Sequence, residues 1–317
     1  MDPEIFFCLL DNLSLRLNSL IFLSMSIKMI PSILMSLYCA FALAQSPSEI
    51  YVFDLSEDGR SIRLSNPINI SANPGYDNQP MFTEDGLTVM FASEREGQTD
   101  IAQYNLSEGY RTWITNTPDS EYSPAPYPKK KKYFTCVRLN KDDTQHLYKY
   151  AFKKKPPEIM LPSLRVGYYL WFNEKTLVSF VIGDIETLQV SNFKYDIRYP
   201  LEKNIGRSLQ KIPSTANGYQ GKMSFISLEH GSPEIYAIDP TNSESVYITD
   251  ALEDSQDLVW TRSGSILMGN ETGLFHYRAD ISKEWLPVII ESDLPLSGFS
   301  RLAISPDGRK IAVVVRE

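Results

Sequence analysis

Residues 301–315 read RLAISPDGRKIAVVV, two apolar runs on either side of a short polar turn. In the turn, Pro306 fixes its own φ, the Asp307 side chain can accept hydrogen bonds from the backbone that follows, and Gly308 can adopt a positive φ. Apolar runs rich in Val and Ile and bounded by such a turn are typical of paired antiparallel strands. This segment therefore predicts a β-hairpin.

The hairpin pattern recurs along the chain. Residues 79–91 read QPMFTEDGLTVMF and residues 123–135 read SPAPYPKKKKYFT, and weaker copies begin near positions 169, 209 and 258. The intervals are about 44 residues, and each leaves room for two further strands, which matches one four-stranded propeller blade. The sequence predicts an all-β fold, a six-bladed β-propeller of four-stranded blades.

The two ends of this repeat region are offset by part of a blade. The final unit has its first and second strands at 301–315 and then stops, whereas residues 50–54 (IYVFD) match a third strand. A blade assembled from both ends removes the open seam and buries exposed strand edges. We expect strands within about 50–70 to pair with strands within about 301–315 and close the ring.

Residues 301–314 resemble the repeat of TolB-like propellers, which are WD40-like proteins with PD40 repeats. Residues 76–80 and 121–124 are similar to the segment that precedes the first strand of each blade in that family. The similarity covers residues 48–317 and implies a TolB-like six-bladed fold. It implies no single function, because the superfamily includes translocation-complex proteins, lyases and the propellers of prolyl-oligopeptidase-like peptidases.

The first 44 residues have the pattern of an export leader. A basic residue, Lys28, precedes an apolar run over 29–41, and Ala42-Leu43-Ala44 is a site that signal peptidase can cleave. Residues 1–24 are not needed for this leader and fit a stretch upstream of the true start codon. The alternative is a retained membrane anchor that uses residues 5–24. We expect cleavage, no stable membrane span afterwards, a single propeller domain at 45–317, and a periplasmic or secreted location.

Charge excludes one class of partner. The formal net charge is −8, whereas proteins that bind a phosphate backbone need clustered Lys and Arg. We therefore expect no nucleic-acid partner, and an envelope protein or a glycan instead.

Polar side chains precede the expected innermost strands, at the mouth of the central channel, where propellers commonly bind ligands. In the alternative interpretation these side chains satisfy one another and hold no ligand. The predicted ligand-binding residues are Asp77, Asn78, Glu121, Tyr122, Arg165, Tyr168, Arg207, Ser208, Asp254 and Ser255.

Signatures of known catalytic or metal sites are missing from the sequence, which has three histidines and neither a Gly-x-Ser-x-Gly nor a His-Glu-x-x-His motif. We expect no metal, no cofactor and no catalytic residue, and interpret the chain as a non-enzymatic recognition or scaffold module of the bacterial cell envelope. One alternative is a lyase or hydrolase acting on an oligosaccharide, with Tyr168 as acid, Arg207 as charge stabiliser and Glu121 as base. Another is a structural assembly factor that binds through its rim, with Lys129–Lys132 as the contact.

Overall fold

The computed structural model of the protein describes residues 46–153 and 155–316, and the chain from Pro47 onward forms one compact unit. The predicted leader at residues 1–44 lies outside the described residues. The described part of the chain is all-β, and it contains no helix that is long and apolar enough to cross a bilayer.

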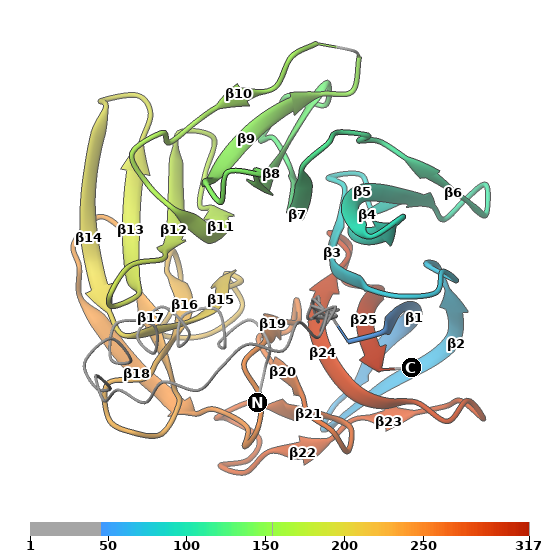
Figure 1. Ribbon diagram of the computed structural model, residues 1–317. Helices are drawn as coiled ribbons and strands as arrows, with labels where there is room; N and C mark the ends of the chain where they lie inside the picture. The colour runs from blue at the N-terminus through green and yellow to red at the C-terminus, as the bar shows by residue number, and fades with distance from the viewer. Residues whose placement is uncertain (1–45, 154, 317) are drawn as a thin grey trace, which may run out of the picture. The chain divides into compact units, whose positions relative to one another are not determined.

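Five blades each consist of four consecutive antiparallel strands (Figure 1). Blade 1 contains β3 (Asp77–Phe82), β4 (Thr88–Arg95), β5 (Gln98–Asn105) and β6 (Tyr110–Trp113). Blade 2 contains β7 (Ser120–Pro126), β8 (Tyr133–Leu139), β9 (Gln145–Ala151) and β10 (Glu158–Ile159). Blade 3 contains β11 (Val166–Trp171), β12 (Thr176–Val181), β13 (Thr187–Asn192) and β14 (Ile197–Lys203). Blade 4 contains β15 (Ile205–Lys211), β16 (Met223–Ser227), β17 (Glu234–Ile238) and β18 (Ser245–Asp250). Blade 5 contains β19 (Leu258–Trp260), β20 (Ile266–Gly269), β21 (Leu274–Tyr277) and β22 (Leu286–Pro287).

Blade 6 is built from both ends of the described chain and confirms the predicted ring closure. Its strands run from the centre outward as β24 (Ser297–Ile304), β25 (Lys310–Arg316), β1 (Ser48–Asp58) and β2 (Ser61–Asn69). β1 and β25 are antiparallel, with Ser48 opposite Arg316 and Asp54 opposite Lys310. A fifth strand that the repeat did not predict, β23 (Ile289–Ile290), pairs in parallel with β2 on the outer edge. The six-bladed, four-stranded prediction is otherwise confirmed.

The turn at 305–308 has the chemistry expected from its sequence. The Ser305 hydroxyl donates to Asp307 Oδ1 at 2.6 Å, and the Arg309 amide donates to the same oxygen at 3.0 Å. Gly308 has φ +74°, and a Cβ there would lie 2.6 Å from Arg262 of blade 5. Glycine is therefore required both by the backbone angle and by the close approach of the neighbouring blade.

Apolar side chains and tryptophan hydrogen bonds join adjacent blades. Ile50 of blade 6 packs in one buried cluster with Phe91 of blade 1. Trp260 of β19 donates its indole N–H to Ser224 Oγ of blade 4 at 2.8 Å, and Trp171 of β11 donates in the same way to Thr135 Oγ1 of blade 2 at 3.1 Å. Each blade is thus held to its neighbour by buried contacts.

Candidate functional site

Irregularities in the innermost strands determine which side chains meet at the centre of the ring. The pairing register shifts between Asn78 and Met81 on β3, between Tyr122 and Ala125 on β7, and between Ser300 and Leu302 on β24. Such a bulge adds a residue to one strand and re-aims the side chains around it. The residues inside these three shifts that have positive φ are Gln79 (56°), Ser123 (50°) and Arg301 (42°).

The corresponding positions of the other three blades also hold polar side chains. β11 and β15 also have register shifts in their first halves, near Tyr168 and Arg207, and Asp257 directly precedes β19. We call the set with one residue from each blade the channel ring. The channel ring consists of Gln79, Ser123, Tyr168, Arg207, Asp257 and Arg301.

Asp257 lies between two arginines of the channel ring. Arg207 Nη2 is 2.7 Å from Asp257 Oδ2, and its Nε donates to Oδ1 at 3.2 Å, so the contact is bidentate. Arg301 Nη1 lies 3.6 Å from Asp257 Oδ1. The three side chains come from blades 4, 5 and 6, and each is close to nine-tenths buried. Two guanidinium groups therefore share one carboxylate inside the ring.

This cluster keeps Asp257 ionised. Burial on its own would raise the pKa of Asp257, but the charges of Arg207 and Arg301 outweigh burial and lower that pKa to about 2. Asp257 is therefore a carboxylate throughout the neutral pH range.

Arg301 also reaches the opposite side of the ring. Its Nη2 donates to the Tyr168 hydroxyl at 2.9 Å, and its guanidinium carbon lies 4.8 Å from the centroid of the Tyr168 ring. Blades 3 and 6 are separated by two blades in either direction around the ring. The Arg301–Tyr168 contact therefore spans the channel.

The predicted site residues fall into two groups. Tyr168 and Arg207 belong to the channel ring, where Tyr168 is half-buried and the Arg207 side chain is close to nine-tenths buried. Asn78 and Tyr122 are half-buried on their strands, and Arg165 and Asp254 are exposed. The remaining four are closed to solvent: Asp77, Glu121, Ser208 and Ser255 are each less than a tenth exposed. Ser208 bonds Leu258 of the next blade, its hydroxyl accepting from the Leu258 amide at 3.1 Å.

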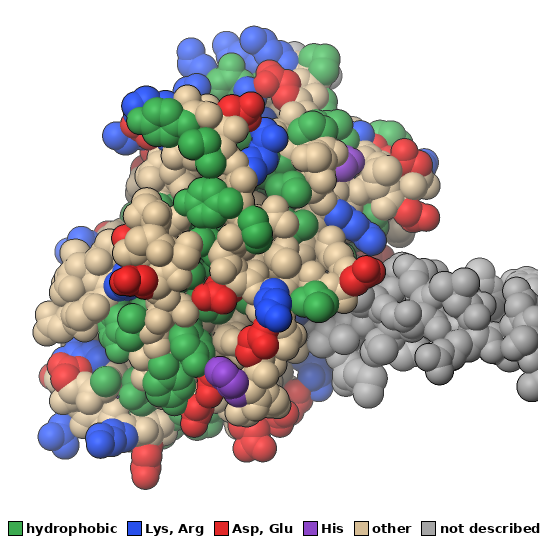
Figure 2. Space-filling view, turned by 90° about the vertical axis from the view of Figure 1, so that its left-hand side faces the viewer, with side chains coloured by type: hydrophobic (Ala, Val, Ile, Leu, Met, Phe, Trp, Pro, Cys, Tyr) green, Lys and Arg blue, Asp and Glu red, His purple; other side chains and the backbone are tan. Residues whose placement is uncertain are grey.

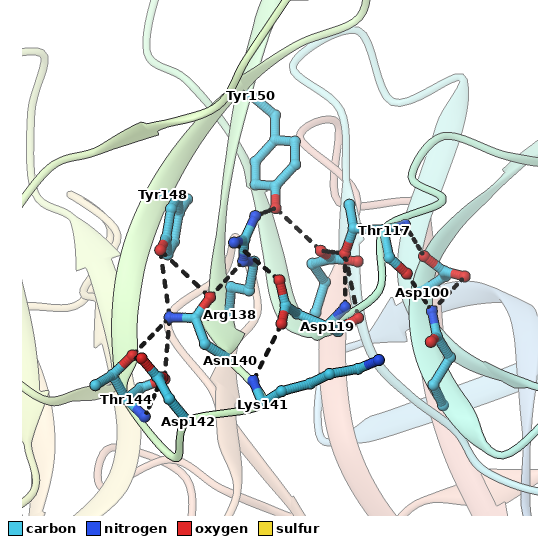
Figure 3. A network of polar contacts seen from close by, with 12 residues as sticks. Asp100, Thr117, Asp119, Arg138, Asn140, Lys141, Asp142, Thr144, Tyr148 and Tyr150 are labelled. Atoms are coloured by element: carbon cyan, nitrogen blue, oxygen red, sulfur yellow. Dashed lines mark hydrogen bonds and ion pairs between the residues drawn. The ribbon is translucent and has the colours of Figure 1, made fainter.

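Glu121 belongs to a network of polar contacts in blade 2. Figure 3 shows this network around Thr117, Arg138 and Tyr150. Its Oε1 accepts hydrogen bonds from Thr117 at 2.5 Å and from the Tyr150 hydroxyl at 3.0 Å. The network continues through Arg138, whose guanidinium pairs with Asp119 at 2.9 Å and donates to Asn140 at 2.7 Å. A base at Glu121 would have to act from a position that solvent does not reach, so the structure does not bring Tyr168, Arg207 and Glu121 together at an open surface.

Burial raises the pKa of two carboxyl groups at matching positions of blades 1 and 2. Both pKa values rise to about 7, for Asp77 and for Glu121, because burial penalises the charged form. Neither carboxyl oxygen of Asp77 has a hydrogen bond of ordinary geometry, so the neighbouring Ser93 and Asn73 offset only part of this effect. These carboxyl groups are protonated over part of the neutral range.

The sequence interpretation missed four members of the channel ring, namely Gln79, Ser123, Asp257 and Arg301. It placed the mouth directly before each innermost strand, whereas the bulges move the channel-facing position further along most of these strands. The 44-residue spacing of the repeat relates these residues in pairs, Gln79 to Ser123 and Asp257 to Arg301, and the Ser123 amide donates to the Gln79 side chain.

Two cavities lie away from the channel ring. A polar cavity of about 290 Å³ is lined by Arg95, Glu96, Gln98, Asn116 and Thr117. A second of about 270 Å³, between blades 5 and 6, has mostly apolar walls that include Leu274, Phe275 and Phe299. In the described part of the chain, no group of three or more His, Cys, Asp or Glu side chains could hold a metal ion.

Fold and site together define a six-bladed β-propeller with a charged cluster in its channel. No protein-family model matches the sequence, and no curated protein matches it either. Among solved structures, a protein assigned as TolB from Agrobacterium tumefaciens is 14% identical, with a TM-score of 0.63 over 86% of this chain and 99% of that one. A chain of a nidogen/laminin complex is 8% identical, with a TM-score of 0.58 over 77% and 93% of the two chains. A gluconolactonase from Xanthomonas campestris is 9% identical, with a TM-score of 0.54 over 76% and 86%. Identities this low establish the fold alone, and on that point the predicted resemblance is confirmed.

Proposed function

We propose that this propeller is a recognition module that binds a protein or glycan ligand at the mouth of its central channel. The observation that carries the proposal is the cluster of Arg207, Asp257 and Arg301, which places two guanidinium groups around one carboxylate in the channel. A guanidinium group is a strong and directional hydrogen-bond donor to an anionic oxygen, so arginine side chains in the channel favour an anionic guest.

The ligand that fits best carries a carboxylate. A guanidinium presents N–H donors in a planar fork that matches both oxygens of a carboxylate. Tyr168 adds an aromatic face beside Arg301, and the exposed Arg165 and Asp254 lie close to the same strand ends. A peptide carboxyl terminus, an acidic side chain or a uronic acid residue has the chemistry to bind here.

The cell envelope is the proposed place of action. The leader-like pattern at 25–44 supports export, and the propeller begins within a few residues of the predicted cleavage site. The proposal combines these two features, an exported chain and a charged channel, in one recognition function outside the cytoplasm.

The test compares probes that differ only in a carboxylate. Binding would be measured by calorimetry with peptides that end in a free or an amidated carboxyl terminus, and with a uronic acid oligomer beside a neutral oligosaccharide. We expect only the carboxylate probes to bind. Arg301→Gln should lower their affinity about tenfold or more, which corresponds to the free energy of one hydrogen bond between charged groups.

Arg309→Gln is the matched control, because Arg309 is exposed and belongs to the turn at the far end of β24. Thermal unfolding of each variant would establish that the fold is kept. Equal binding of amidated and free peptides, or equal affinity in wild type and Arg301→Gln, would reject the channel as an anion-binding site.

A further inference from the structure

A second surface lies where the innermost strands end. In an antiparallel meander, the turns that follow the first and third strands of each blade emerge on the same side of the ring. In blades 2 and 3 these turns span residues 127–132, 152–157, 172–175 and 193–196. They carry Lys129, Lys130, Lys131, Lys132, Lys153, Lys155, Lys175 and Lys194, and within their described residues the acidic side chains are Glu174 and Asp196.

Aromatic side chains form a row beneath these lysines. Tyr127 lies 6.4 Å from Tyr133 and 5.0 Å from Trp171, and Trp171 lies 5.6 Å from Phe193, measured between ring centroids. The row thus runs from blade 2 into blade 3. The Lys130 ammonium lies 5.3 Å from the centroid of the Tyr127 ring, so charge and aromatic surface are interleaved.

Several apolar side chains of the same turns point into solvent. Phe152 is 44% exposed, Tyr195 is 61% exposed, and Ile197, at the start of β14, is 49% exposed. The Phe152 amide donates to the Lys132 carbonyl at 3.1 Å, which holds two of the turns side by side. We call this surface the basic–aromatic patch; it consists of the described residues of the four turns with Tyr133 and Ile197.

The patch stands out against the charge of the rest of the protein. The chain as a whole carries −8, and the two corresponding turns of the adjacent blade 1 contain Glu84, Asp85 and Glu108 with no basic residue. Lys and Arg side chains gather at the upper end of the view in Figure 2, the end at which Figure 1 places blade 2. Interactions between charges more than about 8 Å apart are screened at physiological ionic strength. The charge of this surface therefore matters more for a partner that binds it than the net charge of the whole chain does.

We propose that the basic–aromatic patch docks on the surface of an anionic lipid bilayer. Lysines near an anionic membrane are attracted to its diffuse negative charge, and exposed aromatic and aliphatic side chains enter the headgroup region. The lysines are well suited to this role, because the side chains of Lys129 and Lys131 are 79% and 74% exposed, and their ion pairs with Glu174 and Asp85 are long, at 3.9 Å each.

The composition of the patch distinguishes a lipid surface from an acidic protein. Protein interfaces are enriched in Arg and depleted in Lys, because a planar guanidinium pairs with fixed carboxylates better than a mobile ammonium does. The four turns contain Lys and no Arg. This composition fits a partner whose negative charges are distributed over a mobile surface, such as lipid headgroups, better than one with carboxylates at fixed positions.

Docking through the patch would orient the channel. The bulges of β3, β7 and β24 lie within the innermost strands, and the patch lies beyond the ends of β7 and β11. The side of the ring where the innermost strands begin, including Arg165 and Asp254, would then face away from the bilayer.

The test is sedimentation of the full chain with vesicles. One set contains phosphatidylcholine alone, and the other contains about 30% phosphatidylglycerol, so that the attraction between lysines and anionic lipid is large enough to measure. We expect binding to the anionic vesicles alone, falling as salt is raised. Lys129→Gln with Lys131→Gln should lower the partition coefficient about fivefold per lysine. Tyr195→Ser should weaken binding without changing the salt dependence.

Lys283→Gln is the matched control, since Lys283 is exposed on the β21–β22 turn of blade 5, on the same side of the ring. It should bind as the wild type does. Equal binding to neutral and anionic vesicles, or no effect of the paired lysine change in a protein that still melts normally, would overturn the proposal. Binding to poly-glutamate but not to anionic vesicles would also overturn it, in favour of an acidic protein partner.

Discussion

Replacing Asp77 by asparagine should stabilise the propeller at alkaline pH. Asp77 is fully buried at the start of β3, and its two carboxyl oxygens have no hydrogen bond of ordinary geometry. Burial raises its pKa from 3.8 to about 7. Above that pKa the folded protein contains a buried charge, whereas asparagine has nearly the same shape and stays neutral.

The sign and size follow from the two pKa values. Between pH 3.8 and about 7 the folded state keeps the Asp77 proton that the unfolded state has lost, so the free energy of unfolding falls as pH rises. The slope is about 1.4 kcal/mol per pH unit for one group, which gives an upper value of about 4 kcal/mol above pH 7. Asp77→Asn should remove this contribution, so its advantage over the wild type grows from pH 5 to pH 8 and then levels off.

Urea unfolding followed by tryptophan fluorescence at pH 5, 6, 7, 8 and 9 would measure this difference. The Asp77→Asn protein should keep part of the pH dependence, because the pKa of Glu121 is also raised to about 7. Asp85→Asn is the control: Asp85 lies on an exposed turn, and the Thr83 hydroxyl lowers its pKa, so its replacement should not stabilise the protein at pH 8. Parallel pH profiles for the wild type and Asp77→Asn would refute the reasoning, as would destabilisation of Asp77→Asn at pH 8.

Three further changes test other features of the fold. Trp260→Phe should lower the free energy of unfolding by about 1–2 kcal/mol in urea, because the hydrogen bond to the buried Ser224 is lost. Asp257→Leu should cost about 3–5 kcal/mol in the same assay, since it leaves buried guanidinium groups without their carboxylate; a smaller cost would mean that water reaches the cluster. Deleting Lys310–Arg316 removes the second strand of blade 6, so the far-ultraviolet circular dichroism of the folded protein should be lost at 25 °C.

The repeat was sufficient to predict the fold because each blade carries its own local signal. The turn from Ser305 to Gly308 fixes one hairpin, its spacing fixes the unit length, and the stray third strand at 50–54 predicts closure by both ends. β1 and β25 pair in the register that this closure requires. β23 gave no comparable signal, since a strand of two residues has no periodicity to detect.

The members of the channel ring were only partly predictable from the sequence, because side chains alternate between the two sides of a strand. One inserted residue moves every later side chain to the other side, so a bulge reverses which position faces the channel. Of the predicted residues, Tyr168 and Arg207 lie close to the register shifts of β11 and β15 and belong to the channel ring, whereas Asp77 and Glu121 lie before the shifts of β3 and β7 and are buried. Bulges at Gln79 or Ser123 have no glycine to mark them, so the sequence gives little warning of them.

The pairing of β1 with β25 also determines how the protein responds to mechanical load. Ser48 and Arg316 lie opposite each other at one end of this antiparallel pair, so both chain ends leave the domain from the same end of the two strands. A force that pulls the ends apart would break the hydrogen bonds between β1 and β25 one after another, instead of loading them all at the same time. Separation of β1 from β25 would open the ring, so tension between the two ends would unfold the propeller at low force. Tension applied across any other blade would have to separate strands that are joined by a covalent turn.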